Sequence, residues 1–443
     1  MSKVWLSLIW ATLFAQAHGQ DKEMPMDRPL IVYKIQNGDT LIQLSRKFLR
    51  QPADLEAIRA LNNLKSIDLL PSGELLKVPR HAVKQSPSQA TVISLSCARE
   101  IRAGTPLRPM SIGSVLNEGA IIDIPAECHI SLLLEDSSVI RLPSSAAIKI
   151  SILRKNALES SPEVQLDLVR GRIELDVYKG RSKTTPFEVK TPLSVTGVRG
   201  TEFRVGYAPS EQIGQVEVVG GLVQANGIKD STSQPVTKGQ GLPFDKTGKA
   251  LPIENLLPPP VFERAELVNR SQASYALKLV GRAQSSHYIA THSKTVNFLS
   301  EQLSQRLQAP ELTASNLGSE AIFYKFSSVS NAGLVGSTRQ YGFCTVQGEI
   351  KFGRCRAVFD APLAEGVMIA FSLIRHAQGG VQELVSTNKL QARNGKFTIE
   401  GLPAGHYTWS MSYATTQSHA SSPTNETKQS GAFDLLTLPA ISH

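Results

Sequence analysis

Apolar and polar residues alternate along much of the chain, most clearly between residues 164 and 227. Residues 189–205 read VKTPLSVTGVRGTEFRV, and their β-branched and aromatic residues form short apolar runs. Gly197 and Gly200 interrupt these runs at a position that suits a tight bend between two strands. The flanking segments alternate in the same way, so we expect many short antiparallel strands in a stacked or barrel-like fold.

Residues 30–80 follow a different pattern. Residues 30–35 (LIVYKI) and 75–79 (LLKVP) read as strands, with the turns NGD and PSG beside them. Between them, apolar residues recur at helical spacing in residues 40–47 and 52–61. The apolar faces of these two helices are Leu41, Leu44 and Phe48 in the first and Leu55, Ile58 and Leu61 in the second. The order strand–helix–helix–strand is therefore predicted.

Strand-like alternation returns after residues 256–260 (LLPPP), which we expect to form a stiff polyproline hinge. Several such segments follow, among them YALKLVGR, IFYKFSSV and VMIAFSLI. In a later segment Tyr407 and Trp409 alternate with Thr408, which favours packing in a core over an aromatic platform for a ligand. Two tandem β-sandwiches are predicted, at residues 258–345 and 346–443.

The first 19 residues are expected to be a secretory signal peptide. Lys3 precedes the apolar segment VWLSLIWATLFAQ, and small residues at Ala15, Ala17 and Gly19 offer two cleavage positions. This segment is short for a membrane span, and no other apolar stretch is long enough. We therefore expect an exported protein, periplasmic or associated with the cell wall, with no membrane span after signal removal.

The charge balance is moderately basic. Lys and Arg number 47 against 38 Asp and Glu, a formal net charge of +9. Such a surplus favours polyanionic surroundings, such as wall polymers or lipid head groups. Because the basic residues are scattered, with no run of five, a solvated basic surface is the favoured interpretation. A nucleic-acid partner is not expected.

Four cysteines follow the signal segment, and an oxidising compartment would permit disulfides between them. We favour pairing Cys97 with Cys128 and Cys344 with Cys355, because each pair is close enough in sequence to lie in one domain. Three connectivities exist, and separate buried thiols are an open alternative. The spacing matches no zinc site.

Four motifs follow one another in the central segment: GRIEL, FEVKTPLSVTGVRGTEFRV, VEVVGGLV and VTKGQGL. Their order resembles the FecR domain of bacterial envelope proteins, here placed at residues 96–247 after a polar linker at 81–95. The founding members of that family are inner-membrane regulators that sense an outer-membrane transporter and control a sigma factor. Many relatives are exported proteins with no known signalling role.

Residues 30–80 contain YKIQNGDTL at the front, NNL in the middle and LPSGELLKVP at the end. This combination resembles a LysM domain. Members of that family bind glycans that contain N-acetylglucosamine, such as peptidoglycan, in a shallow groove between two loops. This chain departs from commoner members in having Arg46 and Lys47 where a small residue usually ends the first helix motif.

The resemblance implies which residues would form the groove. They are Gly38, Asp39, Thr40 and Leu41 on one side and Leu69, Leu70, Pro71 and Ser72 on the other. Loop backbone groups would bond the N-acetyl amide, while Leu41 and Leu70 would contact the methyl group and the sugar face. Asp39 and Thr40 are also suited to capping the helix that follows.

The C-terminal part contains two weaker resemblances. Residues 320–344, EAIFYKFSSVSNAGLVGSTRQYGFC, resemble the closing hairpin of a fibronectin type III domain, with its turn at Asn331-Ala332-Gly333. The segment GKFTIEGLPAGHY resembles hairpins of small immunoglobulin-like sandwiches. Both agree with the predicted β-sandwiches.

We expect no catalytic residues, no metal site and no cofactor. The sequence contains no HExxH, no GxSxG elbow, no P-loop and no GxGxxG after a strand. His287 and His292 are five residues apart without a glutamate motif. Arg199 and Glu202 suit a structural ion pair better than an active pair, because no second catalytic group accompanies them.

The predicted fold class is multidomain and mainly β, with a small βααβ LysM unit, a β-rich FecR-like domain and two C-terminal β-sandwiches. The predicted function is that of a non-catalytic cell-envelope protein. It would bind peptidoglycan or another N-acetylglucosamine glycan and present its other domains to an unknown envelope protein, for example by strand addition. The alternatives are a signalling component of FecR type and an accessory factor of a peptidoglycan hydrolase.

Overall fold

The computed structural model describes residues 30–67, 70–97, 102–104, 108–182, 185–198, 200–299, 303–346, 354–361, 368–377, 382–415 and 425–439. The chain divides into two compact units. Unit 1 comprises Met1–Ser86 with Lys155–Ser160 and Ser182–Thr185, and unit 2 comprises the rest. The expected signal peptide, Arg199 and Leu69 lie outside the described residues.

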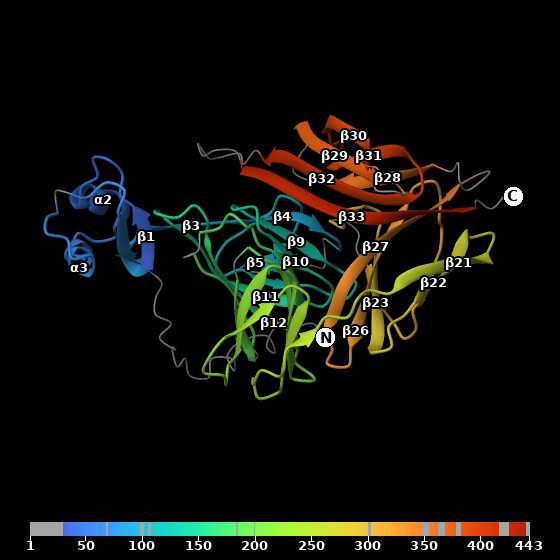
Figure 1. Ribbon diagram of the computed structural model, residues 1–443, viewed down its shortest axis with the longest axis horizontal. Helices are drawn as coiled ribbons and strands as arrows, with labels where there is room; N and C mark the ends of the chain where they lie inside the picture. The colour runs from blue at the N-terminus through green and yellow to red at the C-terminus, as the bar shows by residue number, and fades with distance from the viewer. Residues whose placement is uncertain are drawn as a thin grey trace, which may run out of the picture. The chain divides into compact units, whose positions relative to one another are not determined.

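Unit 1 has the predicted strand–helix–helix–strand order (Figure 1). Strand β1 (Leu30–Lys34) pairs antiparallel with β2 (Leu75–Pro79), and α2 (Leu41–Phe48) and α3 (Asp54–Leu61) lie between them in sequence. A short 3-10 helix, η1 (Arg80–Ala82), follows β2. The two strands and two helices bury one apolar core, whose described members include Ile31, Leu41, Leu44, Ile58, Leu76 and Val78.

Unit 1 also contains a buried ion pair between residues 79 positions apart in sequence. Both carboxylate oxygens of Glu159 accept hydrogen bonds from Arg80, at 2.5 and 2.8 Å. Asn156 and Thr185 donate two more. Burial alone would raise the pKa of Glu159, but these hydrogen bonds and the Arg80 charge hold it below its ordinary value.

Unit 2 begins with a closed β-barrel made of two sheets that share one strand. Most of its strands are short and antiparallel, as the alternation predicts, and its apolar residues form one large core. From β4 onward its strands are β4 (Ala90–Leu95), β5 (Arg102–Gly104), β6 (Arg108–Pro109), β7 (Val115–Leu116), β8 (Ile121–Asp123), β9 (Ile130–Leu134), β10 (Val139–Leu142), β11 (Ala147–Asn156), β12 (Glu163–Asp176), β13 (Phe187–Lys190), β14 (Ser194–Val198), β15 (Glu202–Ala208), β16 (Ile213–Gly220), β17 (Leu222–Gly227), β18 (Gln234–Thr237), β19 (Gln240–Phe244) and β20 (Glu254–Asn255).

The expected linker at 81–95 is wrong. That segment contains the end of η1, the short strand β3 (Gln85–Pro87) and all of β4. Strand β4 pairs with β9, and Ala90 and Val92 lie fully buried in the barrel core. The polar residues up to Gln89 suggested a linker. The alternating apolar residues of the strand begin only at Ala90.

Strand β12 connects the two sheets of the barrel. Its first half pairs with β11 and β13, and its second half pairs with β10 and β15. The strand changes sheet near Gly171, which has a φ of 83°. A Cβ atom at Gly171 would lie 2.7 Å from the Cα of Ala146, so the corner requires glycine for both its conformation and its close backbone approach.

The bend predicted at VRG is present. Strand β14 pairs with β13 and β17, whereas β15 pairs with β12 and β16 in the other sheet. Gly200, with a φ of 60°, stands between the two strands. The bend therefore carries the chain from one sheet to the other and does not close a hairpin.

The C-terminal half forms two β-sandwiches that share an eight-stranded sheet (Figure 1). In order, the sheet contains β24 (Leu303–Leu307), β23 (Ser285–Ser293), β26 (Ile322–Ser330), β27 (Val335–Val346), β33 (Asn425–Pro439), β32 (Gly405–Thr415), β29 (Met368–His376) and β30 (Gln382–Gln391). Strands β21 (Val261–Asn269), β22 (Ser274–Val280) and β25 (Glu311–Ala314) form the second sheet of the first sandwich, and β28 (Cys355–Asp360) and β31 (Lys396–Leu402) pair in the second.

This arrangement corrects the expected boundary at residue 345. The last strand, β33, pairs in parallel with β27 of the first sandwich, and Leu438 lies in the core of that sandwich. The C-terminal strand therefore belongs to both sandwiches. Tyr407 and Trp409 lie in the core of the second sandwich, as the sequence favours.

The structure joins Cys97 to Cys128 and Cys344 to Cys355, the pairs favoured by the sequence. The first bond joins two residues of the segment that forms the barrel. The second joins β27 to β28, and both of its cysteines lie in the core of the second sandwich.

The barrel and the first sandwich are held together by a buried carboxylate. Glu217 on β16 is fully buried and accepts a hydrogen bond from the Val335 backbone N–H at 2.8 Å. It also pairs with Arg204 and Arg172. Arg204 in turn donates to the carbonyls of Val335 and Gly336. The turn between β26 and β27 is thereby fixed against the barrel.

The proline-rich segment is not a free hinge. The Leu256 N–H donates to the Gly239 carbonyl, and the Leu257 carbonyl accepts from the Ser337 N–H. The carbonyls of Pro258 and Pro259 accept from Ser328 and Arg282. Hydrogen bonds on both sides hold the segment in place. The stiffness of proline, from which the hinge was predicted, does not indicate these contacts.

We predict that Gly171→Ala destabilises the barrel by roughly 2–4 kcal/mol, because the new methyl group meets backbone atoms and the residue must keep a positive φ. Calorimetric unfolding measures the loss. Gly197→Ala on β14 is the matched control, since its Cβ would have 3.8 Å to the nearest atom. Equal stability of the two variants would contradict this account of the corner.

Glu217→Gln is predicted to destabilise unit 2 by roughly 3 kcal/mol, because it leaves Arg204 buried without its carboxylate. Glu118→Gln removes a half-exposed partner of Arg154 and is expected to cost less than about 1 kcal/mol. Denaturant unfolding compares the two. A Glu217→Gln variant as stable as Glu118→Gln would show that the buried pair does not hold barrel and sandwich together.

Candidate functional site

The first loop of unit 1 runs from β1 to α2 and is closed by Asp39. The Asp39 carboxylate accepts hydrogen bonds from the Gln36 backbone N–H at 2.7 Å and from the Tyr33 hydroxyl at 2.8 Å. Burial, this hydrogen bond and the charge of Asp39 raise the pKa of Tyr33. Gly38 is exposed at the tip with a φ of 86°, a conformation that costs glycine little.

Thr40 and Leu41 begin helix α2. The Thr40 hydroxyl accepts a hydrogen bond from the Gln43 backbone N–H at 3.2 Å, which makes Thr40 the N-cap. The Leu41 side chain is only 1% exposed and belongs to the core. It leaves almost no exposed surface for the sugar contact that the resemblance implies for Leu41. Its helical spacing with Leu44 accounts for its burial.

The second loop leads into β2. Pro71 and Ser72 are exposed, while Leu70 is half-buried and packs against the core of unit 1. Gly73 has a φ of 88° and its N–H donates to the Ile35 carbonyl at 2.9 Å. Leu70 therefore keeps some surface for an apolar contact, and the exposed turn at Pro71-Ser72 has a fixed shape.

Backbone hydrogen bonds bring the two loops together. The Leu41 N–H donates to the Ile67 carbonyl at 2.9 Å, and the Ile35 N–H donates to the Glu74 carbonyl at 2.9 Å. These bonds join the flanks of the two loops, since Leu41 directly follows Gly38–Thr40, while Ile67 precedes and Glu74 follows the residues from Leu70 to Ser72. Such an arrangement offers loop backbone groups and small polar side chains, which suit hydrogen bonding to an uncharged ligand.

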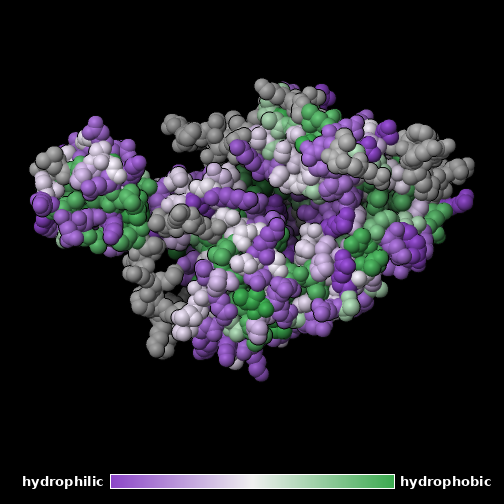
Figure 2. All heavy atoms as spheres, viewed as in Figure 1, coloured by the Kyte–Doolittle hydropathy of each residue, from purple (hydrophilic) through white to green (hydrophobic). Residues whose placement is uncertain are grey.

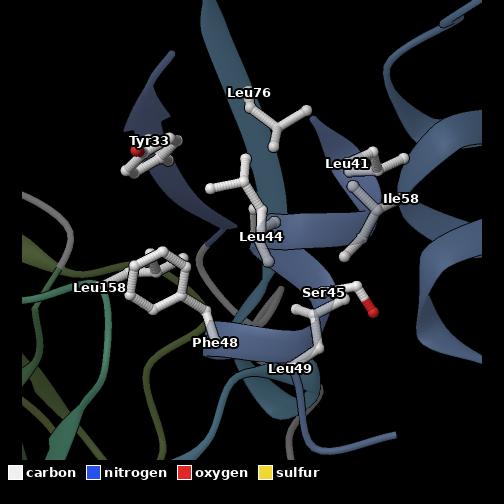
Figure 3. A pocket seen from close by; sticks show the side chains of 10 residues that line it. Tyr33, Leu41, Leu44, Ser45, Phe48, Leu49, Ile58, Leu76 and Leu158 are labelled. Carbon is white, nitrogen blue, oxygen red and sulfur yellow. The ribbon is translucent and has the colours of Figure 1, made fainter. Parts of the chain in front are cut away.

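The residues that line a cavity in unit 1 include Leu41 but none of these exposed loop residues. The cavity is lined by core residues and by Leu158, and Figure 3 shows Tyr33, Phe48 and Leu158 around it. Its volume is about 10 Å³, which is near the minimum for a single water molecule. The cavity is therefore a packing gap and too small for a sugar.

The exposed surface of unit 1 also contains apolar side chains on its strand pair. Val32 on β1 and Leu75 on β2 are 46% and 64% exposed. Figure 2 shows green apolar areas bordered by polar residues on the visible face of this unit. The sequence did not single out either residue. Successive residues of a strand point to opposite faces, and the pattern did not indicate that these two apolar side chains are exposed.

The described residues show no arrangement for metal binding, since no group of three or more His, Cys, Asp or Glu among them could hold an ion. Two Ser–His pairs lie within hydrogen-bonding distance among the described residues: Ser94 with His129 at 3.2 Å, and the sequence neighbours Ser286 and His287 at 2.9 Å. Ser94 and His129 are buried in the barrel, at 2% and 3% exposure, and a substrate cannot reach them. No helix among the described residues is long and apolar enough to cross a membrane.

Sequence reasoning missed the contribution of Leu158 and Glu159 to unit 1. Leu158 packs against the unit 1 core, and Glu159 binds Arg80. No local pattern marks either residue, because their partners lie far away in sequence. The Tyr33–Asp39 hydrogen bond was also missed, although the two residues are only six apart.

Two family descriptions match the chain. Residues 33–79 match the LysM domain, and residues 121–224 match the FecR protein family. LysM and FecR domains are non-catalytic domains of binding and signalling, and they are typical of extracellular or periplasmic proteins. No curated protein sequence matches the chain.

Solved structures resemble parts of the chain. Two crystal structures of an anti-sigma factor candidate from Parabacteroides distasonis are 20% and 19% identical, with TM-scores of 0.25 and 0.26. Each match covers 30% of this chain and 59% of that chain, so this chain spans only part of their length. The FN1–FN3 domains of chicken CNTN1 are 11% identical with a TM-score of 0.16, covering 55% of this chain and 94% of that chain.

The two family matches coincide with the βααβ core of unit 1 and with the barrel of unit 2. The βααβ core of unit 1 falls within residues 33–79 apart from the first residues of β1, and the central strands of the barrel fall within 121–224. The chain carries a LysM domain and a FecR domain, followed by two β-sandwiches that share a sheet.

Proposed function

We propose that unit 1 binds peptidoglycan, or another glycan that contains N-acetylglucosamine, in the groove between its two loops. The groove residues are those implied by the sequence: Gly38, Asp39, Thr40 and Leu41 on one side and Leu69, Leu70, Pro71 and Ser72 on the other. The observation that carries the proposal is the pair of backbone hydrogen bonds that hold these loops together within a LysM domain.

The described groove residues have separate roles in this proposal. Gly38, Pro71 and Ser72 are exposed and would meet the sugar directly. Asp39 already accepts two hydrogen bonds from the protein, so it shapes the loop, and Leu41 supports it from the core. Leu70 would contact the N-acetyl methyl group with its exposed part.

The proposed interaction is weak at each site. A shallow groove formed by two loops buries little of a sugar, and few of its groups are charged. A repeating glycan offers many equivalent sites, so repeated attachment raises the apparent affinity without any new contact. A long wall polymer is therefore a better ligand than a single sugar.

We further propose an exported location, in the periplasm or at the cell wall, and a role for unit 2 in contacting an envelope protein. The glycan-binding unit would then fix the protein to the wall while the FecR domain and the sandwiches face a partner. The FecR match also favours a second candidate, envelope signalling. A protein partner that changes transcription in response to this protein would support that second candidate.

Substitution in the groove should strongly reduce binding to purified sacculi. We expect Thr40→Arg and Ser72→Arg each to reduce the sedimented fraction at least about tenfold, because a long charged side chain fills the shallow site. Ser72→Arg removes no helix cap and separates this effect from the loss of the Thr40 cap. Thr313→Arg, at an exposed threonine on β25, is the control and should bind normally.

The pull-down is best run at low and high salt. Salt screens charge interactions beyond roughly 10 Å at 0.1 M. Binding through backbone and small polar groups should therefore change little with salt, because these groups carry no net charge. Binding that disappears at high salt, and that is equal in all three variants, would mean that the net positive charge attracts the protein to sacculi. The groove proposal would then be wrong.

A matched pair of glycines tests the shape of the first loop. Gly38 and Gly113 have similar φ values, 86° and 83°, and open space around a Cβ atom. Alanine at either position should cost roughly 1 kcal/mol of stability. Only Gly38→Ala should lower glycan affinity, by several-fold in a titration with an N-acetylglucosamine pentamer. Equal affinity of the two variants would exclude the Gly38 loop from the site.

A further inference from the structure

Unit 1 is completed by a segment far along the chain. Lys155–Ser160, which comprises the last two residues of β11 and most of the β11–β12 connection, belongs to unit 1 together with Ser182–Thr185. Leu158 packs against the core of unit 1 and lines its cavity beside Phe48 and Tyr33 (Figure 3). The glycan-binding unit therefore contains apolar surface that its own βααβ segment does not supply.

The segment is held by polar contacts as well. Glu159 and Arg80 have side chains that are 2% and 7% exposed. The Ala157 N–H donates to the Lys84 carbonyl at 3.0 Å. Because a buried carboxylate is costly without its partner, these bonds leave the segment few alternative positions while unit 1 is folded.

A continuous set of contacts leads from this segment to the groove. Asp39 in the first groove loop binds the Tyr33 hydroxyl, and the ring of Tyr33 lies 6.1 Å from that of Phe48. Phe48 and Leu158 line the same cavity. A change in the mobility of Asp39 can thus reach Leu158 through two packed rings.

The end of helix α2 provides a second connection. The Lys84 N–H donates to the Phe48 carbonyl at 2.7 Å, and the Arg50 N–H donates to the Ala82 carbonyl at 2.8 Å. The Lys84 ammonium also donates to the Arg46 carbonyl. The same segment, residues 80–84, bonds Glu159 and Ala157, so the far end of α2 and the β11–β12 connection share one support.

We propose that the β11–β12 connection reports glycan occupancy of the groove. This inference rests on the proposed function. A glycan that orders the Asp39 loop restricts Tyr33 and Phe48, which in turn stabilises the packed position of Leu158 and the bonds of Glu159. Since coupling between two sites is reciprocal, loosening the connection weakens glycan binding by up to the same factor.

Hydrogen exchange on the chain from Gln20 onward tests this proposal. The amides of Ala157 and Glu159 are hydrogen-bonded, so their exchange measures local opening of the connection. A saturating N-acetylglucosamine pentamer is expected to slow exchange in residues 36–44 and also, about fivefold, in Lys155–Ser160. No sugar needs to touch the second segment for this to occur.

Variants supply the reciprocal measurement. Leu158→Ala and Glu159→Gln are each expected to weaken pentamer affinity about fivefold. Leu222→Ala, at a leucine that is 44% exposed, and Glu118→Gln, at the exposed partner of Arg154, are the matched controls and should bind normally. Two different variants guard against a folding defect specific to one of them.

The outcomes separate the two proposals. Protection of the groove loops with no change in Lys155–Ser160 overturns the reporter and leaves the glycan-binding function in place. Unchanged affinity in both Leu158→Ala and Glu159→Gln does the same. If the pentamer protects no segment of the wild-type chain, the proposed function has failed and the reporter fails with it.

Discussion

The structure of the barrel depends on one strand that belongs to two sheets. Strand β12 pairs with different neighbours before and after Gly171, and the close approach of the Ala146 backbone allows no side chain there. The sheets on both sides of this corner bury a continuous apolar core. The beginning of β12 follows Lys155–Ser160, a segment that belongs to unit 1.

Buried carboxylates organise the contacts between distant parts of the chain. Glu159 binds Arg80 within unit 1, and Glu217 binds Arg204 and the backbone of Val335 within unit 2. Each is satisfied only when segments 79 and 118 residues apart come together. The first contact joins distant segments within unit 1, and the second fixes the first sandwich to the barrel within unit 2.

Local sequence patterns were sufficient to predict the helices of unit 1 and the strands of the barrel, because caps and apolar spacing involve residues only a few positions apart. The Thr40 cap and the spacing of apolar residues predict α2, and alternation predicts the barrel strands. Contacts between distant segments were not predictable, such as the parallel pairing of β33 with β27 and the packing of Leu158. The groove residues were predicted from family motifs. Those motifs did not indicate that Leu41 is buried, which follows from its helical spacing in α2.

The central claim is that the two loops of unit 1 form a glycan site, and calorimetric titration tests it most directly. The chain from Gln20 onward would be titrated with N-acetylglucosamine oligomers of increasing length, beside Ser72→Arg. The account predicts binding that strengthens with oligomer length and is lost in the variant. Absence of heat with every oligomer, or equal binding by Ser72→Arg, would contradict it.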